Sequence, residues 1–178
     1  MSAPSRVVRP ATEADAPAVL ALVERAYRGD ASRAGWTTEA DLLDGQRTDL
    51  DDVLAALRDP EGRVLLLVEG PRVLASVRLS RAGDDAVLLG MFAVEPGLQG
   101  SGVGRELLAA AEKTMHRELG ATRGRMTVLV QRTELLAWYG RRGWVATGGR
   151  EPFPYGNPRF GLPRRDDLEF VVLEKALA

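Results

Sequence analysis

The segment that most constrains this chain is VEPGLQGSGVGR, from Val94 to Arg105, where an apolar run meets a glycine-rich turn and then a helical pattern. Gly100, Gly102 and Gly104 let the backbone adopt positive φ angles and approach a ligand closely. The first N–H groups of a helix have no partner within the helix, and the helix dipole favours negative charge there. The segment therefore predicts a phosphate-binding loop, with a glycine turn that binds nothing as the alternative.

Two common phosphate-binding fingerprints do not fit this loop. A dinucleotide fingerprint GxGxxG that starts at Gly100 needs glycine at position 105, where Arg105 stands. A P-loop GxxxxGK[ST] that starts at Gly97 needs lysine directly after Gly102, where Val103 stands. Both departures disfavour an ATP- or NAD-binding protein.

Apolar periodicity predicts one mixed α+β domain over residues 1–178. A hairpin at 63–80 and a strand at 86–94 predict an antiparallel meander. A helix at 102–119 then leads to a strand at 125–130, which predicts a right-handed βαβ unit with its two strands parallel. The remaining expected elements are a strand at 6–10, helices at 13–28, 48–60 and 134–143, one or two turns at 37–45, a strand at 144–147, a Pro-rich loop at 148–167 and a strand at 168–175.

Composition excludes several classes of function. The 178 residues include 24 Lys plus Arg and 25 Asp plus Glu, so the charge gives no reason to expect nucleic acid or an acidic membrane as a partner. There is no Cys, and His116 is the one histidine, so we expect neither a thiolate nucleophile nor a metal site. No signal-peptide pattern is present, and no apolar run reaches the ~18 residues of a membrane span, so we expect a cytoplasmic protein.

Two segments together resemble the GNAT superfamily of N-acetyltransferases. The first is Gln99-x-x-Gly102-x-Gly104, which opens a helix directly after a strand ending in MFAV. The second is LLAWYGRRGWVATG at 135–148, which is similar to the family's FYxxxGF-type motif, and the GWT and FPYG segments resemble small bacterial members. The resemblance spans about 6–175. It implies a GNAT-like fold, a mostly antiparallel mixed sheet of six to seven strands, splayed between the fourth and fifth strands and flanked by about four helices.

The resemblance also implies acetyl-CoA as cosubstrate, without a metal. In the family, the pantetheine arm enters the wedge between the strands corresponding to 86–94 and 125–130 and bonds to backbone groups. Carried over, the residues that border the pantetheine are Phe92, Ala93 and Val94. Those that wrap the pyrophosphate are Gln99, Gly100, Ser101, Gly102, Val103, Gly104 and Arg105, among which Arg105 adds a cation and Ser101 a hydroxyl.

The implied activity is transfer of an acetyl group to a primary amine, which attacks the thioester directly in a ternary complex. Tyr139 stands where family members often place a general acid for the departing thiolate, and a protonated phenol suits that role. The alternative is a core tyrosine, and we expect Trp138 and Trp144 to be core residues. No general base is evident, and the candidates are an ordered water chain, Glu95, Glu134 or a carboxylate from the early helices.

One departure concerns Arg132, which occupies a position where the family often has a cofactor-binding Asn. Arg132 either reaches a phosphate or is a solvated loop cation, and we favour the second. Together with the missing base, this departure leaves a rival hypothesis, a non-catalytic acyl-CoA sensor or a partner-recognition module.

Acceptor recognition is expected from the segments 30–50 and 148–167. Trp36, Glu39, Phe153 and Tyr155 are the candidate acceptor contacts, and the alternative is that the aromatic residues hold long loops on the core. An acidic Glu39 facing the pocket would favour an amine. The acceptor is expected to be a small-molecule or peptide amine. The edge of the strand at 168–175 is a candidate for pairing in a homodimer.

Overall fold

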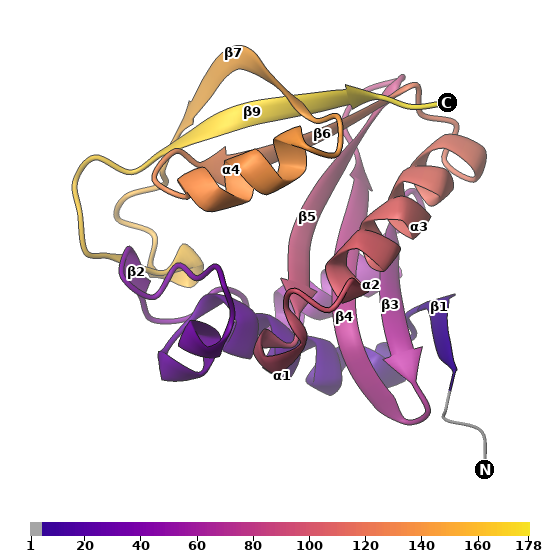
Figure 1. Ribbon diagram of the computed structural model, residues 1–178, viewed down its shortest axis with the longest axis horizontal. Coiled ribbons are helices and arrows are strands. Elements are labelled where there is room, and N and C mark those ends of the chain that lie inside the picture. The colour runs from indigo at the N-terminus through magenta and orange to yellow at the C-terminus, as the bar shows by residue number, and fades with distance from the viewer. Residues whose placement is uncertain (1–4) are drawn as a thin grey trace.

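The computed structural model describes residues 5–178, apart from the side chain of Phe160. Its main feature is a seven-stranded sheet in the order β1-β3-β4-β5-β6-β9-β7 (Figure 1). The strands are β1 (Arg6–Pro10), β3 (Arg63–Glu69), β4 (Arg72–Arg81), β5 (Ala86–Val94), β6 (Arg123–Leu129), β7 (Val145–Pro152) and β9 (Glu169–Ala176). A separate two-stranded sheet pairs β2 (Leu43–Asp44) with β8 (Leu162–Pro163).

Helices cover both faces of the first half of the sheet. The α-helices are α1 (Ala16–Tyr27), α2 (Leu50–Arg58), α3 (Val103–Arg117) and α4 (Thr133–Gly140). Because neighbouring strand residues point to opposite faces, Leu66 of β3 packs in one apolar cluster with Val19 of α1, whereas Leu67 packs in another with Leu107 of α3. Each apolar stripe of the sheet is thus buried by a different helix layer.

The sheet opens between β5 and β6. These two strands pair in parallel only where 86–88 faces 123–125, and beyond this pairing they diverge (Figure 1). The pairing of β5 with β4 also shifts register between Ser76 and Arg78. Opposite this shift, Met91 has a φ of 46°, which non-glycine residues rarely adopt. The irregularity is a β-bulge, and bulges bend a strand. It lies on the part of β5 that has left β6.

The structure confirms the expected fold class. The hairpin, the meander and the parallel βαβ unit are present, and the expected splay lies between the fourth and fifth strands of the sheet, which are β5 and β6. The expected turns at 37–45 are partly wrong, because this segment includes β2, whose Leu43 is buried against Phe153. The short strand expected at 144–147 continues to Pro152 as β7.

The expectation of a free edge at 168–175 is wrong. β9 pairs with β6 on one side and β7 on the other, so it is an interior strand. The chain passes from β7 through the 153–168 segment and returns to insert its last strand between β6 and β7. The edge on this side of the sheet is β7, whose residues are all exposed.

Candidate functional site

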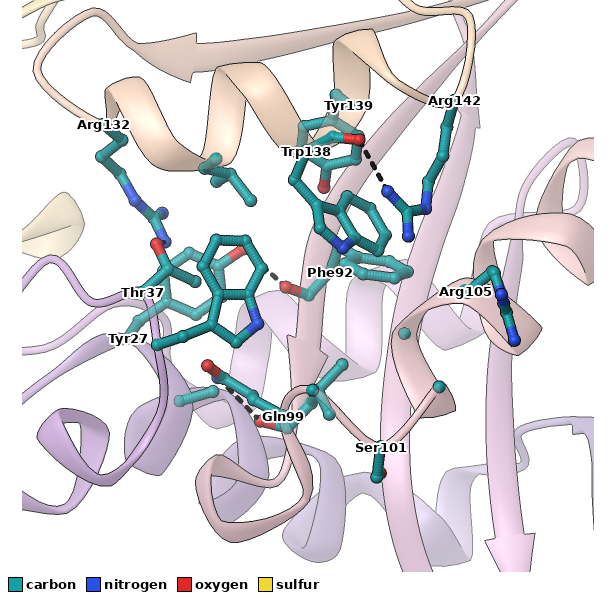
Figure 2. Close-up of a pocket in the computed structure, with 17 residues that line it drawn as sticks. Tyr27, Thr37, Phe92, Gln99, Ser101, Arg105, Arg132, Trp138, Tyr139 and Arg142 are labelled. Carbon is teal, nitrogen blue, oxygen red and sulfur yellow. Dashed lines mark hydrogen bonds between the residues drawn. The ribbon is translucent and has the colours of Figure 1, made fainter.

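A cavity of about 460 Å³ lies at the diverging ends of β5 and β6. It brings together the end of β5, the glycine loop before α3, the inner side of α4 and the segment after α1 (Figure 2). The lining residues are Ala26, Tyr27, Trp36, Thr37, Phe92, Val94, Gln99, Gly100, Ser101, Gly102, Gly104, Arg105, Arg132, Leu135, Trp138, Tyr139 and Arg142.

The glycine loop leaves open space at the start of α3. Gly100 and Gly102 have φ angles of 85° and 88°, which strain any other residue. No side chain caps the helix at Gly102, so the orphan N–H groups of its first turn are not satisfied from there. A Cβ on Gly104 would lie 3.4 Å from Val94 and 3.6 Å from Trp138. The loop therefore forms a cradle suited to an anion, which a side chain at position 104 would narrow.

Two arginines add positive charge beside this cradle. Arg142 stacks on Trp138, with 3.7 Å between the guanidinium carbon and the ring centroid, and its Nη1 donates to the Trp138 carbonyl at 2.9 Å. Burial lowers the pKa of Arg142, and the nearby Arg141 and Arg105 lower it further. Neither Arg105 nor Arg142 has a carboxylate within 4 Å among the described residues. An incoming phosphate would relieve the repulsion between these cations.

Two polar side chains of the loop are held internally. The Gln99 amide packs against Gly35, where an added Cβ would collide with its Oε1, and its Nε2 donates to the Val94 carbonyl at 3.5 Å. The Oε1 of Gln99 is buried and has no hydrogen-bond partner among the described residues. The Ser101 hydroxyl donates to the Leu98 carbonyl at 2.5 Å. The Ser101 hydroxyl therefore donates its hydrogen bond within the loop, so an anion would be bound mainly by backbone N–H groups and arginines.

Tyr139 is buried on α4, with an exposed fraction of 4%. Its ring packs edge-on against Phe92, Trp138 and Trp144. Burial raises the pKa of the Tyr139 hydroxyl well above its ordinary value, and the nearby Tyr27 adds to this effect. No hydrogen bond to this hydroxyl is formed within the described part of the chain. Tyr139 is thus both packed in the core and available as a proton donor in the cavity (Figure 2).

A second cavity, of about 590 Å³, continues along β5 and β6. The two cavities share five lining residues, Tyr27, Phe92, Arg132, Leu135 and Tyr139. Among these, the Tyr27 hydroxyl donates to the Phe92 carbonyl at 2.8 Å, whereas the Tyr139 hydroxyl has no hydrogen-bond partner in residues 5–178 as described. The shared residues mark a junction where ligands in the two cavities would meet.

The interpretation of Arg132 as a solvated loop cation is wrong. Its exposed fraction is 7%, and its Nη1 binds Glu39 Oε1 at 2.9 Å. The other Glu39 oxygen binds Arg28 Nη1 at 2.5 Å. Burial alone would raise the pKa of Glu39, but Arg132 and Arg28 outweigh it and lower the pKa. Glu39 is therefore a compensated buried anion, so its charge is not available to attract an amine.

The other residues expected to contact an acceptor are split. Trp36 lines the first cavity with 42% of its surface exposed, and its ring centroid lies 6.3 Å from that of Trp138. Phe153 is buried in an apolar cluster and lines the second cavity. Tyr155 lines neither cavity. Its hydroxyl accepts from the Leu168 N–H at 2.9 Å and donates to the Arg165 carbonyl at 3.0 Å, which holds the loop in place.

Eight of the ten residues expected to border a cofactor line the first cavity, and the side chains of Ala93 and Val103 are instead buried in the core. Neither candidate base reaches it: Glu95 pairs with Arg25 at 2.7 Å, and Glu134 accepts from Thr37 at 2.9 Å. The lining residues of the first cavity that the sequence interpretation missed are Ala26, Tyr27, Thr37, Leu135, Trp138 and Arg142. For Arg142 the available signal was the basic pair in WYGRRG.

Comparison with known families decides the affiliation. The family model described as "Acetyltransferase (GNAT) family" matches residues 20–144. The chain belongs to the GNAT family of acetyltransferases. No curated protein matches this GNAT chain significantly. Among its described residues, none of the helices is both long and apolar enough to span a bilayer, and no three His, Asp or Glu side chains gather as a metal site.

Solved structures share the fold of this GNAT chain at low identity. The ribosomal-protein-S18-alanine N-acetyltransferase from Escherichia coli matches with a TM-score of 0.72 and 14% identity over 98% of this chain and 95% of the other. The structure of yncA, a putative acetyltransferase from Salmonella typhimurium with its cofactor acetyl-CoA, matches with a TM-score of 0.67 and 21% identity. This match covers 97% of this chain and 94% of the other. A chimeric spermidine N-acetyltransferase from Vibrio cholerae and hSSAT matches with a TM-score of 0.67 and 12% identity, over 96% of this chain and 94% of the other.

Proposed function

We propose that this GNAT protein transfers an acetyl group from acetyl-CoA to the primary amine of an acceptor, which attacks directly in a ternary complex. The main support for this proposal is that a candidate anion-binding loop and a candidate proton donor line the same cavity. The uncapped glycine loop of α3 opens into the cavity from one side, and the uncommitted Tyr139 hydroxyl faces it from α4. Anion binding and proton donation to the leaving thiolate are two of the tasks that acetyl transfer from CoA requires.

The described residues fit acetyl-CoA as a substrate. The backbone N–H groups at the start of α3, with Arg105 and Arg142, would hold the pyrophosphate. Beyond 86–88, the edges of β5 and β6 no longer pair with each other, so this stretch of β5 faces the amides of pantetheine. Two of its carbonyls already accept hydrogen bonds, that of Phe92 from the Tyr27 hydroxyl and that of Val94 from Gln99 Nε2. When bound, acetyl-CoA supplies an activated acetyl group as a thioester.

Tyr139 would act as the general acid. Tyr139 is protonated at neutral pH, as a phenol with an ordinary pKa also is, and its hydroxyl forms no hydrogen bond with the described residues, so it can donate this proton to the departing thiolate. Tyr27 is a weaker candidate because its hydroxyl already donates to the Phe92 carbonyl. No carboxylate lines the first cavity among the described residues, so a water molecule is the simplest carrier of the proton that the amine loses.

Thiol release tests the proposal. Free CoA is measured in mixtures of the protein, acetyl-CoA and a panel of primary amines, for the wild type and for Tyr139→Phe. We expect amine-dependent release in the wild type and a loss of about 10²- to 10⁴-fold in kcat for Tyr139→Phe, with unchanged acetyl-CoA affinity. Arg81→Gln, which alters an exposed residue of β4 outside both cavities, is the control.

An unchanged kcat in Tyr139→Phe at saturating substrates would make Tyr139 structural and move the acid elsewhere. Tight acetyl-CoA binding with no release over the whole amine panel would instead support an acyl-CoA sensor. Absence of acetyl-CoA binding would remove the proposal altogether.

A further inference from the structure

The second cavity has more cationic than anionic side chains in its lining. Its lining includes four arginines and three carboxylates. Two of the arginines, Arg28 and Arg132, share Glu39 in the buried cluster described above. A third, Arg78, has its Nη1 3.6 Å from Oδ1 of Asp52. Glu39 and Asp52 are thus already engaged, whereas Glu151, the third carboxylate of the lining, forms no ion pair with any described residue.

Arg47 is the remaining arginine of this lining. Within the described residues it is the only one of the four without a carboxylate within 4 Å. Its position is nevertheless fixed. Its backbone N–H donates to Glu24 Oε1 at 2.7 Å, and its guanidinium carbon lies 5.1 Å from the centroid of the Tyr27 ring. The charge of Arg47 is felt by the nearby Glu39, which is already paired with Arg28 and Arg132. A half-buried guanidinium that is held in place and makes no ion pair within 4 Å of a described carboxylate is suited to binding an anionic group of a ligand.

The placement of Arg47 relates it to the proposed chemistry. Tyr27, on which Arg47 packs, lines both cavities together with Tyr139. A molecule in the second cavity that contacts Arg47 therefore also lies beside the junction where acetyl transfer would occur. A volume of about 590 Å³ falls within the range of pockets for small molecules.

We propose that the acceptor carries a carboxylate near its primary amine, as an amino acid does, and that Arg47 binds this carboxylate. The inference rests on the proposed acetyl transfer, because it takes the second cavity as the acceptor site. A guanidinium binds a carboxylate through two parallel hydrogen bonds, which would also orient the amine. Polyamines are disfavoured, since their additional ammonium groups would meet the arginines that line this cavity.

Matched acceptors test this inference. Acetyl-CoA-dependent thiol release is measured for the common amino acids, for their carboxamides, and for putrescine and spermidine. The wild type should prefer the acid over the matched amide in kcat/KM. Arg47→Gln should lower kcat/KM for the acid by roughly 10- to 100-fold, mainly because KM rises, and should change kcat/KM for the amide far less. Arg47→Lys should recover part of the loss, because it restores the charge.

Arg81→Gln is the control, since Arg81 is an exposed residue of β4 outside both cavities. Equal or better use of amides or polyamines by the wild type overturns the inference, as does an acid preference that survives in Arg47→Gln. The melting temperature of the acetyl-CoA-saturated protein with each acid or amide supplies a readout without turnover. Acids should stabilise it more than amides, and equal effects overturn the inference. Failure of acetyl-CoA itself to stabilise the protein marks failure of the proposed function.

Discussion

At the scale of single residues, the buried triad Arg28–Glu39–Arg132 is a set of contacts that could not be predicted from the sequence. Glu39 and Arg132 are 93 positions apart, yet their side chains are within 2.9 Å. Neither residue type nor local pattern separates a solvated loop arginine from one buried against a distant carboxylate. Tyr139 was found because it lies inside a motif, whereas Trp138 beside it was taken for core although it lines the cavity.

The triad makes Glu39 a strong stabilising residue. Glu39→Gln would leave two buried guanidinium groups without a full counter-charge, and removing one partner of a buried pair costs about 3 to 5 kcal/mol. Urea unfolding at pH 7 measures this loss. Glu13→Gln is the control, because it breaks an exposed ion pair with Arg58 and should leave the unfolding midpoint nearly unchanged. Equal midpoints for wild type and Glu39→Gln would contradict the burial of this pair.

The triad also makes stability depend on pH. The pKa of Glu39 is lower in the folded protein, where Arg132 and Arg28 outweigh the effect of burial, than the ~4.3 of an unfolded chain. Below about pH 5 the unfolded state therefore binds more protons, so the contribution of Glu39 is complete above that pH and is lost as the pH falls. The difference in unfolding free energy between wild type and Glu39→Gln should shrink from pH 7 to pH 4. A difference that grows toward acid would contradict this sign.

At the scale of elements, local patterns predicted the elements that form the first cavity and failed for those that depend on distant pairing. The apolar run of β5 and the helical spacing of α3 lie in continuous sequence, so both were expected nearly at their observed bounds. By contrast, β2 exists because Leu43 and Asp44 pair with residues 162 and 163. β7 is longer than expected because a register shift lets it continue beyond Ala146 along β9.

The second position of α3 offers a test of the cradle. Gly104→Ala adds a Cβ facing Val94, Trp138 and Phe92, all of which line the first cavity, at contact distances that the fold tolerates. Alanine favours helix over glycine by up to about 1 kcal/mol, so stability should hold or rise. Acetyl-CoA affinity measured by calorimetry should fall, because the added methyl group narrows the space for the ligand.

Gly140→Ala provides the matched control for this substitution. Gly140 also lies in a helix, and a Cβ there would meet nothing within 4 Å. It should leave acetyl-CoA binding unchanged. Equal affinities for Gly104→Ala and the wild type would show that the ligand does not pass this position.

At the scale of the whole molecule, the splayed sheet explains why the family was predictable from sequence and the acceptor was not. The wedge depends on β5, the α3 loop and β6, which are close in sequence and carry the motif. The second cavity is assembled from segments that span Tyr27 to Phe170, including Arg47 and Glu39, so its charge emerges only after folding. Solved structures of the same fold bear the names of acceptors as different as a ribosomal protein and spermidine.

The most direct test of the account is the thermal unfolding of the purified protein with acetyl-CoA, ATP or NAD. We predict stabilisation by acetyl-CoA, about 2.7 kcal/mol at a concentration of 100 times its Kd, and none by NAD. ATP should have little effect, because it lacks the pantetheine that fills the wedge. No stabilisation by acetyl-CoA, or equal stabilisation by all three compounds, would contradict a wedge built for acetyl-CoA.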